Sequence, residues 1–165
     1  MKKHIFAAFL LIISLLCVGT VSAEDADANT YKSDIYTYTV SGNSATITGV
    51  DDINGRVDVP DTIDGYSVTA LGDGAFGGSE NITEVTLPNT ISSVGSMCFA
   101  YSSSIKAVHL SKGISAIEEG AFYQCEALIG ITVPYGVRGI GEKAFAKCPN
   151  LSSVSIASTV DSISE

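Results

Sequence analysis

Apolar residues recur every 23 positions through the second half of the chain. Each copy of the pattern begins with an aliphatic residue and carries a phenylalanine five positions later, and four further aliphatic positions keep the same register in every copy. The phenylalanines are Phe76, Phe99, Phe122 and Phe145. Self-similarity at a fixed short period is the signature of a repeat architecture. Residues 71–162 are therefore predicted to form four stacked coils of a solenoid, mainly of β structure.

Each copy contains one segment that alternates aliphatic with small or polar residues, as in residues 84–88. A period of two is typical of a strand with one buried and one solvated face, so the equivalent strands are predicted to pair into a parallel sheet along one side of the stack. A second, shorter extended piece follows. Residues 118–125 then place Ala121, Phe122 and Cys125 at spacings that favour a short helical turn, so we expect helical turns on the opposite face.

The segment before the repeats has the pattern of an N-terminal cap. Residues 36–40 and 45–48 read as two strands that flank a turn containing Gly42, which together indicate a β-hairpin. Residues 56–60 match residues 84–88 at an offset of 28 and indicate an irregular first coil. We therefore expect a cap over residues 36–70, preceded by a flexible mature N-terminus over residues 24–35.

The other end of the stack shows no such cap in the sequence. Residues 163–165 align with the start of a copy and are interpreted as the beginning of a truncated fifth repeat. An open coil exposes apolar surface and unpaired strand edges. Either self-association covers this last coil, or the polypeptide is the front part of a longer protein, and we favour the second explanation.

Residues 1–23 have the pattern of a secretory signal peptide. Lys2 and Lys3 precede an apolar run, and residues 21–23 supply the small residues of a cleavage site. The run is shorter than the roughly 20 apolar residues of a spanning helix, so an uncleaved anchor is disfavoured. Lipidation of Cys17 is also disfavoured, because Leu16 precedes it. The predicted location is secreted or on the cell surface, without membrane insertion of the mature chain.

The mature chain is strongly acidic. Removal of the signal takes away two lysines and no acidic residue, so the net charge falls from −9 to −11. Such a charge repels nucleic acids and anionic membranes, so we expect no nucleic-acid partner and no membrane insertion of the mature chain.

No cofactor or metal site is predicted. Cys125 and Cys148 hold equivalent positions in adjacent copies, where parallel side chains seldom reach disulfide geometry, so free buried thiols are favoured over a bridge. Carboxylates at residues 51–52 and 58–61 could hold calcium, but solvated turns are favoured because their spacing matches no known loop.

With these residues in view, the chain resembles the BspA-type leucine-rich repeat family over residues 36–165. Residues 140–151, Ile-Gly-Glu-Lys-Ala-Phe-Ala-Lys-Cys-Pro-Asn-Leu, follow the 23-residue consensus. Ser79 and Ser102 replace the family's cysteine, and Cys98 replaces its alanine, which leaves the fold unaffected. The resemblance implies a leucine-rich-repeat-like solenoid in a secreted or surface protein that binds host proteins or other cells, and it carries no catalytic residues.

The solvated face of the predicted sheet is the candidate binding surface for a protein or glycan on a host or neighbouring cell. The residues assigned to it are Glu84, Thr86, His109, Thr132 and Ser155. Tyr101, Tyr123 and Tyr135 fall in turns and could contribute from the rim. We find no catalytic motif and expect a non-enzymatic binding or adhesion module. A structural spacer, or the front fragment of an exported protein whose functional domain lies elsewhere, remains the alternative.

Overall fold

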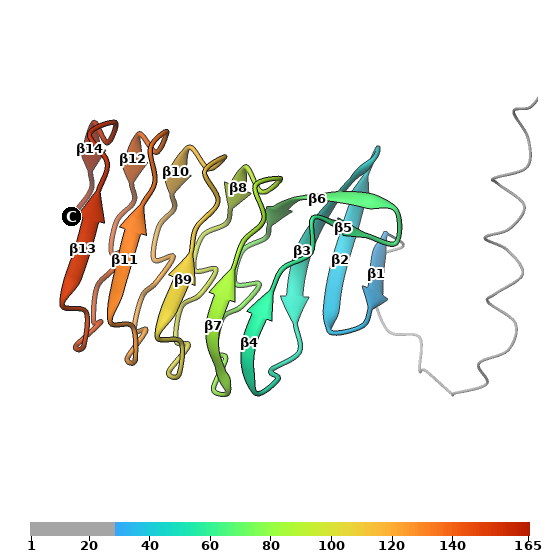
Figure 1. The fold of residues 1–165 in the computed structure, drawn as a ribbon, viewed down its shortest axis with the longest axis horizontal. Coiled ribbons are helices and arrows are strands. Elements are labelled where there is room, and N and C mark those ends of the chain that lie inside the picture. Colours follow the sequence, from blue (N-terminus) through green and yellow to red (C-terminus); the bar gives the residue numbers. More distant parts are fainter. Residues whose placement is uncertain (1–28) are drawn as a thin grey trace, which may run out of the picture.

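The computed structural model describes residues 29–165. These residues form an elongated stack of coils with an antiparallel cap at its N-terminal end (Figure 1). The solenoid prediction is confirmed. The predicted signal peptide over residues 1–23 lies outside the described residues. The described part of the chain contains no helix that is long and apolar enough to cross a membrane.

The cap is a mixed sheet that begins with three antiparallel strands. These are β1 (Thr30–Ser33), β2 (Tyr36–Ser41) and β3 (Ser44–Val50), and the β2–β3 pair confirms the predicted hairpin. β6 (Tyr66–Leu71) pairs with β3 in parallel and with β5 (Thr62–Ile63) in antiparallel orientation. This change from antiparallel to parallel pairing converts the cap into the first turn of the solenoid.

Within the segment predicted to be flexible, residues 24–35, residues 30–33 instead form strand β1, and residues 24–28 lie outside the described residues. The side chains of β1 are almost all exposed, so its sequence shows no buried face. The order comes from its backbone, because Thr30 to Ser33 pair with Tyr36 to Thr39 along the edge of β2. Edge pairing of this kind depends on the backbone and leaves little trace in the pattern of apolar residues.

Five parallel strands line one side of the stack and form sheet B. They are β4 (Gly55–Asp58), β7 (Ile82–Thr86), β9 (Ala107–His109), β11 (Gly130–Val133) and β13 (Ser153–Ile156), in that spatial order. Figure 1 shows these strands side by side, one from each coil.

The pairing of these strands follows the repeat. Glu84 of β7 pairs with Ala107 of β9, and Gly130 of β11 pairs with Ser153 of β13, each 23 residues apart. Arg56 of β4 pairs with Glu84, at the longer offset of 28. The irregular first coil therefore enters the sheet in register, as the sequence predicts.

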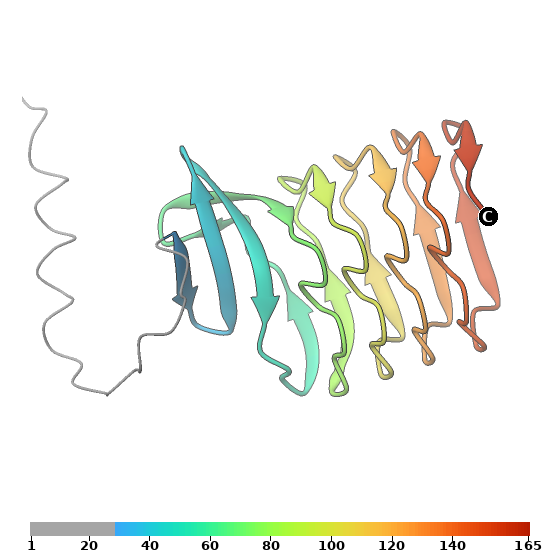
Figure 2. The same cartoon turned by 180° about the vertical axis from the view of Figure 1, so that it is seen from behind.

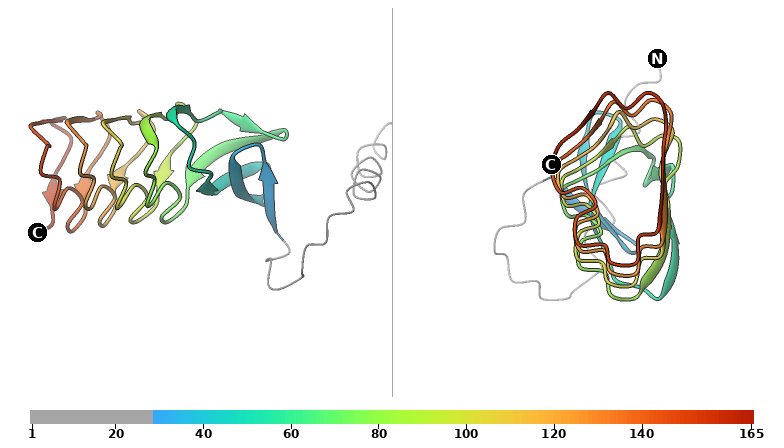
Figure 3. Two further views of the ribbon diagram at one scale, coloured as in Figure 1. Left: turned by 90° about the horizontal axis from the view of Figure 1, so that it is seen from below. Right: turned by 90° about the vertical axis from the view of Figure 1, so that its left-hand side faces the viewer.

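A second ladder of short strands runs along the stack. It contains β8 (Ser93–Val94), β10 (Ala116–Ile117), β12 (Gly139–Ile140) and β14 (Ser162–Ile163). β10, β12 and β14 pair in parallel, while β8 pairs with β6 of the cap. Viewed along the stack, the coils overlie one another (Figure 3).

The predicted helical turns are wrong, because the face opposite sheet B consists of linked tight turns (Figure 2). In the third coil, the amides of Gly120, Phe122 and Gln124 donate to carbonyls of the next coil at 2.8 to 3.0 Å. The intervening amides donate to carbonyls three residues earlier. A helix cannot send every second amide to a neighbouring chain segment, so pairing between coils replaces helical hydrogen bonding.

The phenylalanines form one continuous column through the core. Phe76, Phe99 and Phe122 are fully buried, whereas Phe145 near the C-terminal end is half-buried. Consecutive ring centroids lie 5.2, 5.1 and 5.4 Å apart, and the rings are stacked. The prediction of a buried phenylalanine column is therefore confirmed.

Aliphatic side chains of the last coil are more exposed than their equivalents in inner coils. Val154 and Ile163 are 42% and 63% exposed, whereas Val85 and Val108 are buried. Coils on both sides cover the inner residues, and this difference follows from the one-dimensional stacking of the fold.

Candidate functional site

The outer face of sheet B collects one set of alternating side chains from every coil. Val85, Val108 and Ile131 point into the core, so their neighbours along each strand point outward. Since successive side chains of a strand alternate between faces, Glu84 and Thr86 of β7 lie on the same face as His109 of β9. The sheet thus displays polar residues from separate coils on one surface.

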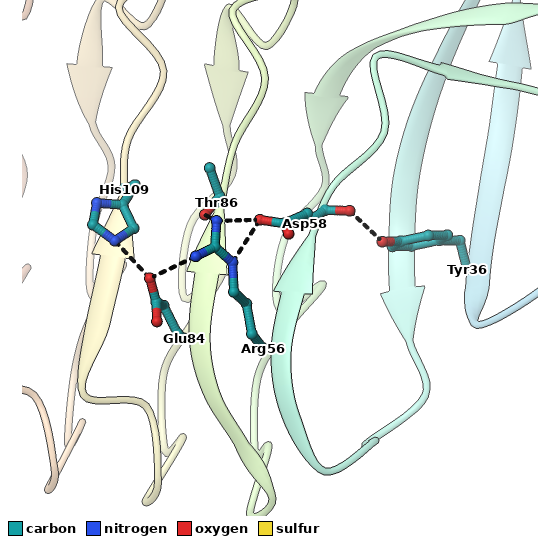
Figure 4. Close-up of polar contacts among 6 residues, drawn as sticks. All are labelled: Tyr36, Arg56, Asp58, Glu84, Thr86 and His109. Atoms are coloured by element: carbon teal, nitrogen blue, oxygen red, sulfur yellow. Dashed lines mark hydrogen bonds and ion pairs between the residues drawn. The ribbon is translucent and has the colours of Figure 1, made fainter.

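A polar cluster spans the first three strands of this surface (Figure 4). The Arg56 guanidinium contacts the Asp58 carboxylate at 2.8 Å and the Glu84 carboxylate at 3.4 Å. Glu84 also lies 2.9 Å from Nε2 of His109, and Arg56 donates to the Thr86 hydroxyl at 3.2 Å. We call these five residues the ionic cluster.

The ionic cluster orients polar groups and adds little to stability. The side chains of Arg56, Asp58 and His109 are each more than half exposed. Exposed ion pairs contribute about 0 to 1 kcal/mol, because water competes for each charge. The hydrogen bond from Arg56, together with its charge, holds the pKa of Asp58 below its usual value, so this carboxylate remains ionised. The outcome is a fixed pattern of positive and negative groups on an open surface.

The cluster does not have the arrangement of a nucleophile and its base. A hydroxyl nucleophile is activated by a hydrogen bond to a neighbouring base. Here the Thr86 hydroxyl accepts from Arg56, while the contact of His109 is with Glu84. His109 therefore makes no hydrogen bond with the Thr86 hydroxyl in this arrangement.

A shallow hollow of about 390 Å³ lies beside the cluster, over β9 and β11. Its lining includes Ala107, which has only a methyl side chain, and Gly130, which has none, so the surface is low there. His109, Lys112 and Thr132 also line it. His109 belongs to both features, so the ionic cluster and the hollow are continuous. We refer to the two together as the strand-face site.

All five predicted site residues lie on the outer face of sheet B. Glu84, Thr86 and His109 come together in the ionic cluster, and Thr132 lines the hollow. Ser155 pairs with Thr132 across β11 and β13, one coil further along. Their role in binding stays a prediction.

Arg56 and Asp58 belong to the irregular first coil. The match between residues 56–60 and 84–88 places them on the solvated face from the sequence, although they were not among the five predicted site residues. Only Lys112 was not assigned to this surface from the sequence. Lys112 lies in the turn after β9, outside the strand alternation, so only the coil path brings it to the hollow.

Asp52, one of the carboxylates considered for calcium, is engaged in hydrogen bonds within the protein. Asp52 accepts hydrogen bonds from the amides of Glu80 and Asn81 and from the Asn81 side chain at 2.8 to 3.1 Å. Desolvation works against ionisation of Asp52, but these hydrogen bonds outweigh it and keep the pKa of the carboxyl below its usual value. Among residues 29–165, no group of three or more acidic, histidine or cysteine side chains is placed to hold a metal ion.

The cysteines of the repeats are free thiols, as predicted. Cys125 Sγ donates to the carbonyl of Phe99, and Cys148 Sγ donates to that of Phe122, both at 3.0 Å. Ser102 makes the equivalent bond to Phe76 at 2.7 Å, which explains why serine can replace cysteine at this position. Burial raises the pKa of Cys125 to about 12, so its thiol is unreactive in the folded protein.

Comparison with known families and structures identifies the same architecture. The model of the BspA type leucine rich repeat region matches residues 61–165 as six copies. A leucine rich repeat protein of T. pallidum is similar with a TM-score of 0.74 at 25% identity, and the match covers 85% of this chain and 64% of that protein. A leucine-rich repeat protein from Bacteroides capillosus ATCC 29799 has a TM-score of 0.71 at 33% identity, with 78% of this chain and 99% of that chain covered.

A leucine rich cell surface protein from Faecalibacterium prausnitzii A2-165 shares the fold at 24% identity. Its TM-score is 0.62, and the match covers 86% of this chain and 46% of that chain. Comparison with curated protein sequences found no significant match. The family model covers well over half of the chain, so the chain belongs to the BspA-type leucine-rich repeat family.

Proposed function

We propose that this protein is a non-catalytic binding module that contacts a macromolecular partner through the strand-face site. The observation that supports it is the continuity of the ionic cluster with the hollow over β9 and β11. Together these features present fixed charges of both signs beside an accessible depression on an otherwise regular sheet.

The openness of the site favours a protein or an extended glycan over a small metabolite. Small-molecule pockets bury most of the ligand surface within concave walls. The strand-face site is instead shallow, and the side chains of His109 and Arg56 are 58% and 54% exposed. Charges of both signs act on the specificity and rate of association with a macromolecule more than on raw affinity.

The proposed location is the cell surface or the extracellular space. Two proteins that share the fold are described as a leucine rich cell surface protein and as the pneumococcal vaccine antigen PcpA. The predicted signal peptide over residues 1–23 supports the same location. At the surface, such a module would act in adhesion to a host or neighbouring cell.

Binding of the labelled mature protein to cultured mucosal epithelial cells, measured by flow cytometry, tests the proposal. We expect saturable binding that Thr132→Lys reduces at least fivefold, because the new side chain enters the hollow. Thr30→Lys is the matched control, since Thr30 is exposed in β1 of the cap, outside sheet B and the lining of the hollow, and receives the same charge. Equal binding by the two variants would refute the site, and no saturable binding to cells would favour an inert spacer.

A further inference from the structure

A second hollow lies among the linked turns, on the side of the stack opposite sheet B. Its volume is about 180 Å³, and it shares no lining residue with the hollow of the strand-face site. Its walls are formed by Met97, Tyr101, Glu119, Gly120, Tyr123 and Lys143. These residues come from three successive coils. We call this feature the tyrosine hollow.

Tyr101 gives this hollow an accessible aromatic surface. Its side chain is 54% exposed, and its ring meets the edge of Tyr123 with a centroid distance of 5.5 Å. The amine of Lys147 lies over the Tyr123 ring, 5.0 Å from its centroid, and so covers one face of that ring. Tyr101 is therefore the ring available for contact with a ligand.

The fold itself does not require tyrosine at this position. Tyr101 has a φ of 61°, in the left-handed region that disfavours large side chains. Gly78 holds the same position in the preceding coil with a φ of 72°. Glycine therefore satisfies this turn, and Gln124 and Lys147 occupy the equivalent position in the next two coils with φ of 55° and 58°, so the turn does not itself demand an aromatic residue.

The floor of the hollow is formed by a thioether packed against a glycine. A Cβ atom added to Gly120 would lie only 2.2 Å from Met97 Sδ, so the methionine side chain occupies the space that glycine leaves. Methionine provides a soft, apolar contact surface. The hollow thus combines an apolar floor with an aromatic wall.

Polar groups of opposite character complete the rim. Glu119 offers a carboxylate that accepts hydrogen bonds, whereas Lys143 offers an amine that donates. Lys143 is also paired with Glu142, which holds it at the rim. The Glu119 carboxylate opposes an anionic ligand and the Lys143 amine opposes a cationic one, so the electrostatics favour a neutral ligand that both donates and accepts.

We propose that the tyrosine hollow binds a neutral hexose residue of a glycan. Sugar hydroxyls both donate and accept, which matches Glu119 and Lys143, and the C–H face of a pyranose carries the slight positive charge that the face of an aromatic ring attracts. At about 180 Å³ the hollow is smaller than the roughly 300 to 1,000 Å³ of drug-sized ligand pockets, so it suits one ring. This site is independent of the proposed strand-face function.

The test is saturation-transfer NMR on the mature protein with three methyl glycosides as probes. These are methyl α-mannoside, methyl β-galactoside and methyl β-N-acetylglucosaminide, each at millimolar concentration. We expect at least one glycoside to bind and Tyr101→Gly to weaken its affinity about tenfold. The variant should keep the wild-type unfolding temperature, because Gly78 already shows that glycine fits this turn. Tyr135→Ala, which removes a tyrosine that is 76% exposed in a turn outside the hollow, is the matched control and should bind as wild type.

Three results would overturn the proposal. One is that none of the three glycosides binds. Another is that binding persists in Tyr101→Gly or is lost equally in Tyr135→Ala. The third is that only sialyllactose or phosphocholine, included as charged probes, binds at the hollow. Failure here leaves cell binding through the strand-face site untouched, since Thr132→Lys tests that surface separately.

Discussion

Truncation of Phe122 to alanine tests the physical basis of the fold most directly. Phe122 is fully buried in the third coil, between the rings of Phe99 and Phe145 at 5.1 and 5.4 Å. Its removal deletes two stacking contacts and opens a cavity at the junction of three coils. Because each coil of a solenoid contacts only its neighbours, the loss falls on both interfaces of the third coil.

We expect Phe122→Ala to lower the free energy of unfolding by about 3 to 5 kcal/mol, the range for a packed aromatic. Phe145→Ala is the internal comparison, because Phe145 is half-buried and stacks on Phe122. Its truncation exposes less new cavity, so we expect a smaller loss of about 1 to 2 kcal/mol.

Urea unfolding followed by far-ultraviolet circular dichroism measures both losses. The midpoint of the transition reports stability, and the slope reports the surface exposed on unfolding. For the thermal transition, a loss of about 3 kcal/mol corresponds to a decrease in Tm of about 6 °C or more. The two variants should differ in midpoint in the order set by the burial of the two rings.

A Phe122→Ala variant that unfolds within about 1 kcal/mol of wild type would refute the reasoning. The same holds if Phe145→Ala proves the more damaging of the two, because stacking and burial would then not determine the stability of the column.

Three further predictions concern backbone packing, pH and thiol chemistry. Gly141→Ala should lower the urea midpoint, since a Cβ there would lie 2.6 Å from a backbone nitrogen of the preceding coil, whereas Gly49→Ala, with 3.6 Å to its nearest neighbour, should be tolerated. The lowered pKa of Asp52 means that its contribution to stability is full above the ordinary value of 3.8 and is lost as the pH falls through the folded-state pKa. Unfolding temperatures measured from pH 6 to pH 2 should therefore fall less steeply in Asp52→Asn than in wild type, and parallel curves would contradict this. A maleimide should label the half-buried Cys148 before Cys125, and mass spectrometry of the native protein showing the reverse order would contradict the burial of Cys125.

The sequence predicts the repeat and its register because the same chemistry recurs at one spacing. The phenylalanines at 76, 99, 122 and 145 must share one environment if each coil is equivalent, and the structure stacks them in one column. The offset of 28 between residues 56–60 and 84–88 likewise predicts the pairing of Arg56 with Glu84.

The turns show where local spacing is insufficient. Ala121, Phe122 and Cys125 are spaced as on one face of a helix, but the amides of alternate residues donate to the next coil. Positive φ angles at Gly120 and Gln124 complete these turns. A pattern of buried side chains cannot distinguish helix from linked turns when backbone groups find their partners in another coil.

The periodicity of the chain predicts the coil length, the buried column, the strand pairing and the face on which the predicted site lies. Which side chains meet is set by the folded stack. The stack connects Arg56 and His109 through the Glu84 carboxylate, brings Lys112 to the hollow, and places Tyr101 against Tyr123 across two coils. The reason is that periodicity is a property of one chain segment repeated, whereas a contact between side chains depends on the stacking distance and rotation between coils.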